Sequence, residues 1–114
     1  MSLPLKRIGV KGRSNMERIK GMTLADFEGQ ESTFTQAYEV WDPKKNANKF
    51  WRVYVFGNYV VRHHGRHGSK GLYTVHMAYS SWEARDEAGM IAQKKRDDGY
   101  EKEVSFLDRF AREI

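Results

Sequence analysis

The residue types best suited to chemistry lie in one short run, HHGRHGSKG, which spans residues 63–71. In it, Arg66 and Lys70 stand between three glycines that recur at every third position. Glycine lets backbone N–H groups approach a ligand closely, and the Arg guanidinium is a planar fork that matches phosphate. The run fits neither G-x-x-x-x-G-K-[ST] nor G-x-G-x-x-G, which excludes the common nucleotide-binding loops. It therefore indicates anion recognition by Arg66, Lys70 and loop amides.

The same run offers two other kinds of site. Ser69 beside His67 has the residue types of a nucleophile and its base, but neighbouring turn residues seldom point at one another and no orienting acid is apparent. His63, His64 and His67 have the residue type of metal ligands, but a fourth ligand is missing and the surrounding positive charge opposes cation binding. We therefore expect no catalytic residue, no metal and no cofactor.

The placement of charge supports the anion-binding interpretation. The net charge is +5, and residues 1–25 hold six Lys and Arg against Glu17 alone. A second basic segment, residues 43–82, contains seven Lys and Arg and all four histidines but no Asp or Glu. A charge run is often only a solvated face. Solubility is better served by interspersed signs, however, so an acid-free window around a glycine-rich turn favours a nucleic-acid partner.

Length and composition limit the class of protein. A chain of 114 residues fits one domain with a single core. The absence of Cys excludes disulfides, zinc-thiolate sites and thiol nucleophiles. There is neither a signal-peptide pattern nor a run of about 18 apolar residues. We expect a soluble protein that is located in the cytoplasm and does not contact a membrane.

The elements that must position the basic loop are strands. Residues 50–56 and 59–63 are rich in β-branched and aromatic side chains and are separated by Gly57 and Asn58 alone, which predicts a tight hairpin. Residues 33–41 and 72–79 predict two further strands. Because side chains alternate along a strand, Trp51 belongs to the better core face, and Arg62 and His64 share one face. We expect Trp51, Trp82 and Tyr100 to be core aromatics rather than stacking platforms.

A helix and two terminal segments complete the prediction. Ser80, with Glu83 three residues on, predicts a helix that runs to about residue 98, with Ala84, Ala88 and Ile91 on the sheet and Lys95 at the rim of that packing. Residues 101–114 have the spacing of a terminal amphipathic helix. Residues 1–32 lack sustained periodicity and are interpreted as a basic N-terminal arm that is mobile or loosely docked.

Three segments together resemble a known family. They are the run from residue 48 to residue 71 with its GRHGSKG, a helix that starts SSWEA, and the closing KRDDGY. They are similar to the WGR domain, which is named for a Trp-Gly-Arg triplet and occurs in DNA-dependent poly(ADP-ribose) polymerases and in bacterial proteins. The resemblance covers residues 33–100. His64 replaces the Trp of the triplet, which in the polymerases stacks at a DNA end.

The resemblance implies an α+β fold, with an antiparallel, hairpin-rich sheet of about four strands packed against one main helix. To this we add the expected C-terminal helix, which gives an arm (1–32), a WGR-like domain (33–100) and a terminal helix (101–114) in a bacterial or phage-like protein. By resemblance, Asn48, His64, Arg66 and Lys95 contact DNA or lie beside the contact.

The sequence therefore predicts a non-catalytic nucleic-acid-binding module that contacts the DNA backbone or a strand end. DNA is favoured over RNA, and the oligomeric state is left open. The alternative is a protein-interaction module that docks a partner on the sheet and the C-terminal helix. The expected binding residues are Asn48, Arg62, His64, Arg66, Lys70 and Lys95.

Overall fold

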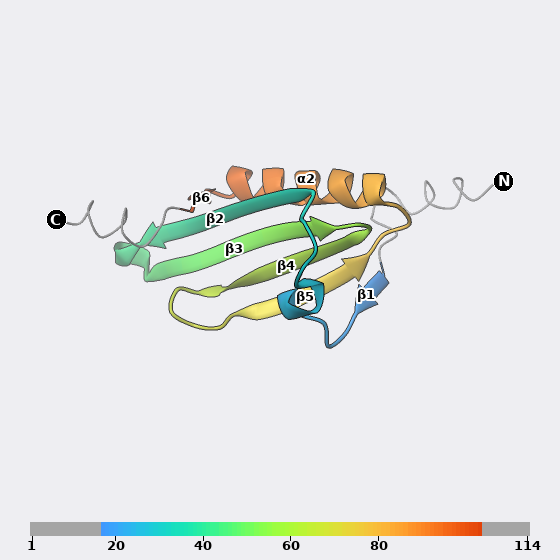
Figure 1. Cartoon of the computed structure of the whole chain (residues 1–114). Coiled ribbons are helices and arrows are strands. Elements are labelled where there is room, and N and C mark those ends of the chain that lie inside the picture. Colours follow the sequence, from blue (N-terminus) through green and yellow to red (C-terminus); the bar gives the residue numbers. More distant parts are fainter. Residues whose placement is uncertain (1–16, 104–114) are drawn as a thin grey trace.

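The computed structural model describes residues 17–103 of the chain. Within this range the chain forms a six-stranded antiparallel sheet with one α-helix against it (Figure 1). The strand order is β1-β5-β4-β3-β2-β6. The elements are β1 (Glu17–Ile19), β2 (Phe34–Asp42), β3 (Ala47–Phe56), β4 (Tyr59–Arg66), β5 (Leu72–Met77), α2 (Ser81–Asp97) and β6 (Glu101–Lys102), with short 3₁₀ helices η1 (Leu24–Phe27) and η2 (Pro43–Lys45).

The central hairpin agrees with the sequence prediction. β3 and β4 are joined by Gly57 and Asn58 alone, and Phe56 pairs with Tyr59 across the turn. Gly57 has a φ of 60°, a conformation that suits glycine because it has no Cβ to clash. This two-residue turn fixes the register of β3 against β4, and hence which side chains lie opposite one another.

The helix α2 begins and ends as expected. Ser80 is its N-cap, and the Ser80 hydroxyl accepts a hydrogen bond of 3.1 Å from the backbone N–H of Glu83. Gly99, just after the helix, has a φ of 101° and allows the chain to turn away. Ala84, Ala88 and Ala92 are buried, so a stripe of small side chains lets the helix lie close to the sheet.

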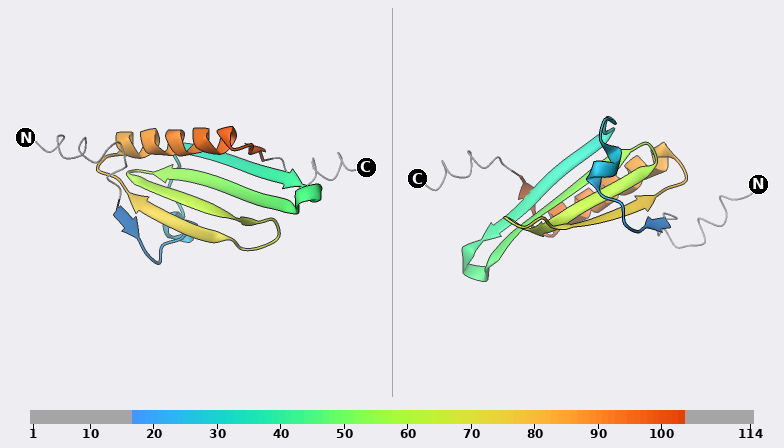
Figure 2. Two further views of the ribbon diagram at one scale, coloured as in Figure 1. Left: turned by 180° about the vertical axis from the view of Figure 1, so that it is seen from behind. Right: turned by 60° about the horizontal axis from the view of Figure 1, so that its bottom comes forward.

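The main core lies between α2 and one face of the sheet, and this confirms the predicted core face. Trp51, Val53 and Val55 of β3 are at most 3% exposed and pack with the buried alanines of the helix. The helix packs against β2, β3 and β4. Figure 2 shows it running along one side of the sheet. The part of the same face that belongs to β5 and β1 lies to one side of the helix.

A second apolar cluster covers the opposite face of the sheet, where η1 packs (Figure 2, right). Phe27 of η1 is 4% exposed and stacks on Phe56 with ring centroids 4.8 Å apart. β1 pairs with β5 at the sheet edge. The interpretation of residues 1–32 as a loosely docked arm is therefore wrong for residues 17–32, whereas residues 1–16 lie outside the described range. Edge pairing and a single buried ring leave no periodic pattern in the sequence.

Two further expectations need correction. The sheet has six strands within residues 17–103 rather than about four, because the short strands β1 and β6 add to its edges. The terminal helix predicted for residues 101–114 is wrong at its start, since Glu101 and Lys102 pair with Glu39 and Tyr38 of β2. Residues 104–114 lie outside the described range. No helix in the described part of the chain is long and apolar enough to cross a membrane.

Candidate functional site

A pocket of about 300 Å³ opens between the sheet and the C-terminal half of α2. Four of its lining residues are basic, and no described Asp or Glu lines it. Trp51, Thr74 and Tyr100 form other parts of the wall. The basic residues are Lys49 from β3, Arg62 and His64 from β4, and Lys95 from α2.

The pocket follows from strand alternation and helix spacing. On β3, Lys49 lies on the same side as the buried Trp51, and on β4, His64 is the direct cross-strand partner of Trp51. Arg62 comes two residues earlier on the same face as His64. Lys95 follows the buried Ala92 by three residues, so it leaves the helix just beyond the last buried turn. The three predicted residues Arg62, His64 and Lys95 are thus brought together.

Lys95 is held between two aromatic rings. Its Nζ lies 5.6 Å from the ring centroid of Trp51 and 5.0 Å from that of Tyr100. Such contacts favour the ammonium electrostatically. Burial nevertheless lowers the pKa of Lys95, and the charges of Arg62 and Lys49 lower it further, while Asp98 acts in the opposite direction. The Lys95 ammonium therefore lies in a basic environment, and a bound anion would reduce the electrostatic repulsion there.

Burial and neighbouring cations also act on His64 and Arg62, although the cations differ: Lys95 and Arg62 act on His64, and Arg18 acts on Arg62. Burial lowers the pKa of His64, and the charges of Lys95 and Arg62 add to the effect. Burial also lowers the pKa of Arg62, whose Nε is buried without a hydrogen-bond partner among the described residues. The Glu87 carboxylate offsets part of the charge of Arg62, and a phosphate would supply the missing acceptor and further negative charge.

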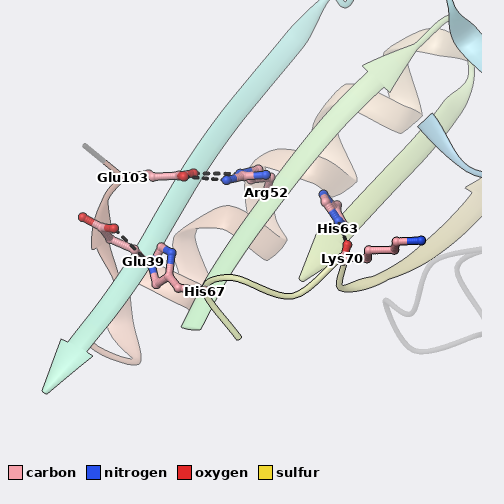
Figure 3. Close-up of polar contacts among 6 residues, drawn as sticks. All are labelled: Glu39, Arg52, His63, His67, Lys70 and Glu103. Carbon is pink, nitrogen blue, oxygen red and sulfur yellow. Dashed lines mark hydrogen bonds and ion pairs between the residues drawn. The ribbon is translucent and has the colours of Figure 1, made fainter. Parts of the chain in front are cut away.

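The glycine-rich loop is fastened from the opposite face of the sheet (Figure 3). The His63 Nε2 lies 2.6 Å from the backbone oxygen of Lys70. Because a carbonyl oxygen can only accept, Nε2 is the protonated nitrogen and donates this hydrogen bond. The His67 Nε2 lies 3.3 Å from a carboxylate oxygen of Glu39. Burial lowers the pKa of His67, more strongly than the Glu103 carboxylate raises it, and we therefore take His67 as a neutral imidazole beside a carboxylate at neutral pH.

Glycine is required in this loop for space as well as for backbone angle. A Cβ on Gly71, whose φ is +75°, would lie 2.7 Å from the His64 carbonyl oxygen and 2.8 Å from the Phe50 ring. A Cβ on Gly65 would lie 2.7 Å from the Cα of Gly71. The two strands that flank the loop therefore approach more closely at its base than side chains would permit.

The other three predicted binding residues do not line the pocket. By alternation Asn48 faces the opposite side of the sheet, where its Oδ1 is buried without a described hydrogen-bond partner. Arg66 is exposed and donates a hydrogen bond of 3.1 Å to the Asn46 side chain, although it pairs directly with Lys49 of the pocket. Lys70 is exposed, and Figure 3 shows its ammonium directed away from His63.

The geometry gives no support to the nucleophile or metal alternatives. The Ser69 hydroxyl donates to the backbone oxygen of Arg66 at 2.8 Å and not to His67. His63 and His64 lie on opposite faces of β4, as adjacent strand residues must. Within residues 17–103 no group of three or more His, Cys, Asp or Glu is placed to hold a metal ion.

Sequence reasoning missed Lys49, Trp51 and Tyr100 as parts of the site. Lys49 had a usable signal, because it stands two residues before Trp51 on a strand and so shares its face. Trp51 and Tyr100 were interpreted as core aromatics, and Trp51 is indeed 3% exposed. Their second role, as walls around Lys95, depends on where α2 crosses the sheet. Trp82, which was also expected in the core, is 67% exposed.

Comparison with known proteins identifies the family. The family model of the WGR domain matches residues 34–106. Among solved structures, the chain is similar to a crystal structure of a protein from Bacteroides fragilis, with 26% identity and a TM-score of 0.58 over 71% of this chain. The match covers 22% of the Bacteroides protein, so this chain corresponds to about a fifth of its length. No curated protein shows significant similarity. Because the family model covers more than half of the chain, the protein belongs to the WGR domain family, a non-catalytic module that is associated with nucleic-acid binding in poly(ADP-ribose) polymerases.

Proposed function

We propose that the protein is a non-catalytic module that binds nucleic acid, DNA in preference to RNA, by holding backbone or strand-end phosphate in the basic pocket. The observation that carries the proposal is the convergence of four basic side chains in a pocket that no described acidic residue lines. Folding brings these charges together at an electrostatic cost, since burial and mutual repulsion lower the pKa of both His64 and Lys95. A bound phosphate offsets that cost.

Phosphate fits the pocket better than a base edge does. Arg62 offers a planar fork with an unused buried N–H, and Lys95 offers an ammonium whose position is fixed by two rings. Among the described residues, no Asn, Gln, Asp or Glu lines the pocket, so the side chains that pair with adenine and cytosine edges are missing from it. Phosphate contacts set register and orientation without reading sequence, so we expect weak sequence preference.

The basic rim of the pocket provides further contacts. Arg66 lies opposite Lys49 on the neighbouring strand, and Lys70 extends from the fastened loop. Together with the pocket, these exposed cations can contact further phosphates along the nucleic-acid backbone. Because His63 and His67 already hold the loop in place, the loop loses little conformational entropy when the nucleic-acid backbone binds.

The experiment is a titration of fluorescently labelled blunt, nicked and single-stranded oligonucleotides at about 50 and 200 mM salt. Contact with about five phosphates predicts a slope of about −4 to −5 when log affinity is plotted against log salt. Lys95→Gln should weaken binding strongly, whereas Lys102→Gln, the same charge change at an exposed site on β6, should have little effect. Affinity that does not depend on salt, or absence of binding at the lower salt, would remove the proposal.

A protein-interaction module is the second candidate. It is favoured by two large apolar side chains of α2, since Trp82 is 67% and Met90 52% exposed. Exposed aromatic and Met side chains are enriched at protein interfaces. A partner that binds there should be released by Trp82→Ala and should be insensitive to salt and to Lys95→Gln, which distinguishes this surface from the basic pocket.

A further inference from the structure

The edge strand β1 adds a basic group beside the pocket. β1 lies outside residues 34–106, the part of the chain that the family model matches. Its Arg18 is the direct cross-strand partner of His76 on β5. The charge of Arg18 reaches both His76 and Arg62, and after burial it is among the causes that lower the pKa of each. The basic surface therefore continues from β4 across β5 to β1.

Arg18, His76 and Arg62 share the face of the sheet on which α2 packs. His76 pairs with Val60, which is buried under the helix, and Arg18 pairs in turn with His76. Because directly paired residues point to the same side, all lie on the face that also carries Arg62 and the pocket. The strands β4, β5 and β1 are neighbours at about 4.8 Å spacing, so this row extends roughly 10 Å.

Arg62 connects the two regions. It lines the pocket on one side, and its Nη2 lies 3.4 Å from the His76 Nδ1 on the other. That contact is long and its Nε has no described hydrogen-bond partner, so the guanidinium keeps unused donors between the two regions. The carboxylate of Glu87 acts on Arg62 and offsets part of the positive charge. Arg18, Arg62 and Glu87 together still carry a net positive charge.

We propose that Arg18, His76 and Arg62 form a second phosphate-binding subsite, which receives the sugar-phosphate backbone of the same nucleic-acid strand that enters the basic pocket. The inference rests on the proposed function and adds to it a path for the strand across β5 to β1. One strand of a duplex carries a phosphate about every 3.4 Å along the axis, and successive phosphates also rotate about that axis, so a row of roughly 10 Å meets about two phosphates. His76 can donate a ring N–H to such a phosphate, and the two arginines provide charge-assisted contacts.

The test measures duplex binding by the full chain over a salt series for Arg18→Gln, Arg18→Lys and Lys102→Gln. Loss of one phosphate contact predicts that the slope of log affinity against log salt becomes about 0.9 less steep for Arg18→Gln. Its affinity at low salt should fall about threefold to tenfold, the range for an exposed charge-assisted contact. Arg18→Lys keeps the charge and should retain the slope. Lys102→Gln, at the opposite edge of the sheet, should behave like the parent.

A second measurement locates the contact on the DNA. Replacing single phosphates by uncharged methylphosphonates should reveal positions that weaken binding of the parent, and one of them should lose its effect in Arg18→Gln because the charge that it contacts is gone. If Arg18→Gln keeps the parental slope and the same sensitive positions while Lys95→Gln loses binding, the second subsite is wrong and the pocket stands. If the parent itself shows no salt-dependent binding, the proposed function fails and the subsite with it.

Discussion

His64 lies directly opposite Trp51 on the neighbouring strand, and both residues line the pocket that Lys95 enters. The chain thus places a titratable ring where the triplet of its family has Trp. Burial and the charges of Lys95 and Arg62 lower the pKa of His64, so the ring is mainly neutral at neutral pH in the free protein. The indole of Trp51 lies next to the Lys95 ammonium, with Nζ 5.6 Å from the ring centroid.

The first prediction concerns pH. A bound phosphate favours the imidazolium and raises the pKa of His64 in the complex, so binding takes up a proton between the free and bound pKa values. Affinity should therefore increase as pH falls through the range near and below about 6.5 and level off below the free pKa. Titrations between about pH 5.5 and 8 at fixed ionic strength check this. His64→Gln should reduce the dependence and leave the part that His76 contributes in the second subsite, whereas His67→Gln, on the opposite face, should retain all of it.

The second prediction concerns the size of the ring. We expect His64→Trp to bind DNA more tightly, by roughly tenfold, because an indole provides more stacking area. Binding should also become less dependent on pH. If both His64→Trp and Arg66→Ala bind like the parent at every pH, the triplet is not part of the contact surface.

The third prediction concerns the base of the loop. Gly71→Ala should lower the free energy of unfolding by roughly 2 to 4 kcal/mol, because its Cβ would overlap the His64 carbonyl oxygen at a positive φ. Gly68 also has a positive φ, +91°, but nothing lies within 4 Å of a Cβ there. Gly68→Ala should therefore cost only about 1 kcal/mol. Chemical denaturation of the two variants provides the comparison, and equal losses would contradict the crowding at Gly71.

The fourth prediction concerns the connection of β6 to the sheet. Arg52 donates hydrogen bonds from Nε and Nη2 to the two carboxylate oxygens of Glu103, at 2.8 and 2.6 Å (Figure 3). The two side chains are 29% and 18% exposed, so solvent reduces the strength of the pair. We expect Glu103→Gln to lower the free energy of unfolding by about 1 kcal/mol. Glu101→Gln, a neighbouring exposed site, is the control and should change stability little.

The fifth prediction concerns the segment that was expected to be an arm. Phe27→Ala should lower the free energy of unfolding by about 3 to 5 kcal/mol, because a buried ring that stacks on Phe56 is removed. Leu72→Ala removes another large apolar side chain, but one that is 68% exposed, and should be nearly neutral. A Phe27→Ala variant as stable as the parent would show that η1 contributes little to the fold.

The sequence by itself determined the elements whose signals are local. Alternation along β3 and β4, the Gly57-Asn58 turn and the cap at Ser80 predicted the central hairpin and α2, and the structure confirms them. Alternation also placed Arg62 and His64 on one face, where both line the pocket. These features depend on residues close together in the chain, so the side-chain period is sufficient to predict them.

Tertiary structure decided the rest. The position of Lys95 between Trp51 and Tyr100 depends on where α2 crosses the sheet, and that crossing is set by the packing of small alanines far from β3 in sequence. The short strands β1 and β6 exist because the edges of β5 and β2 offer unpaired backbone groups to them. Strands of two or three residues have no period that could reveal them, so only the assembled sheet brings Arg18 to His76 and Glu103 to Arg52.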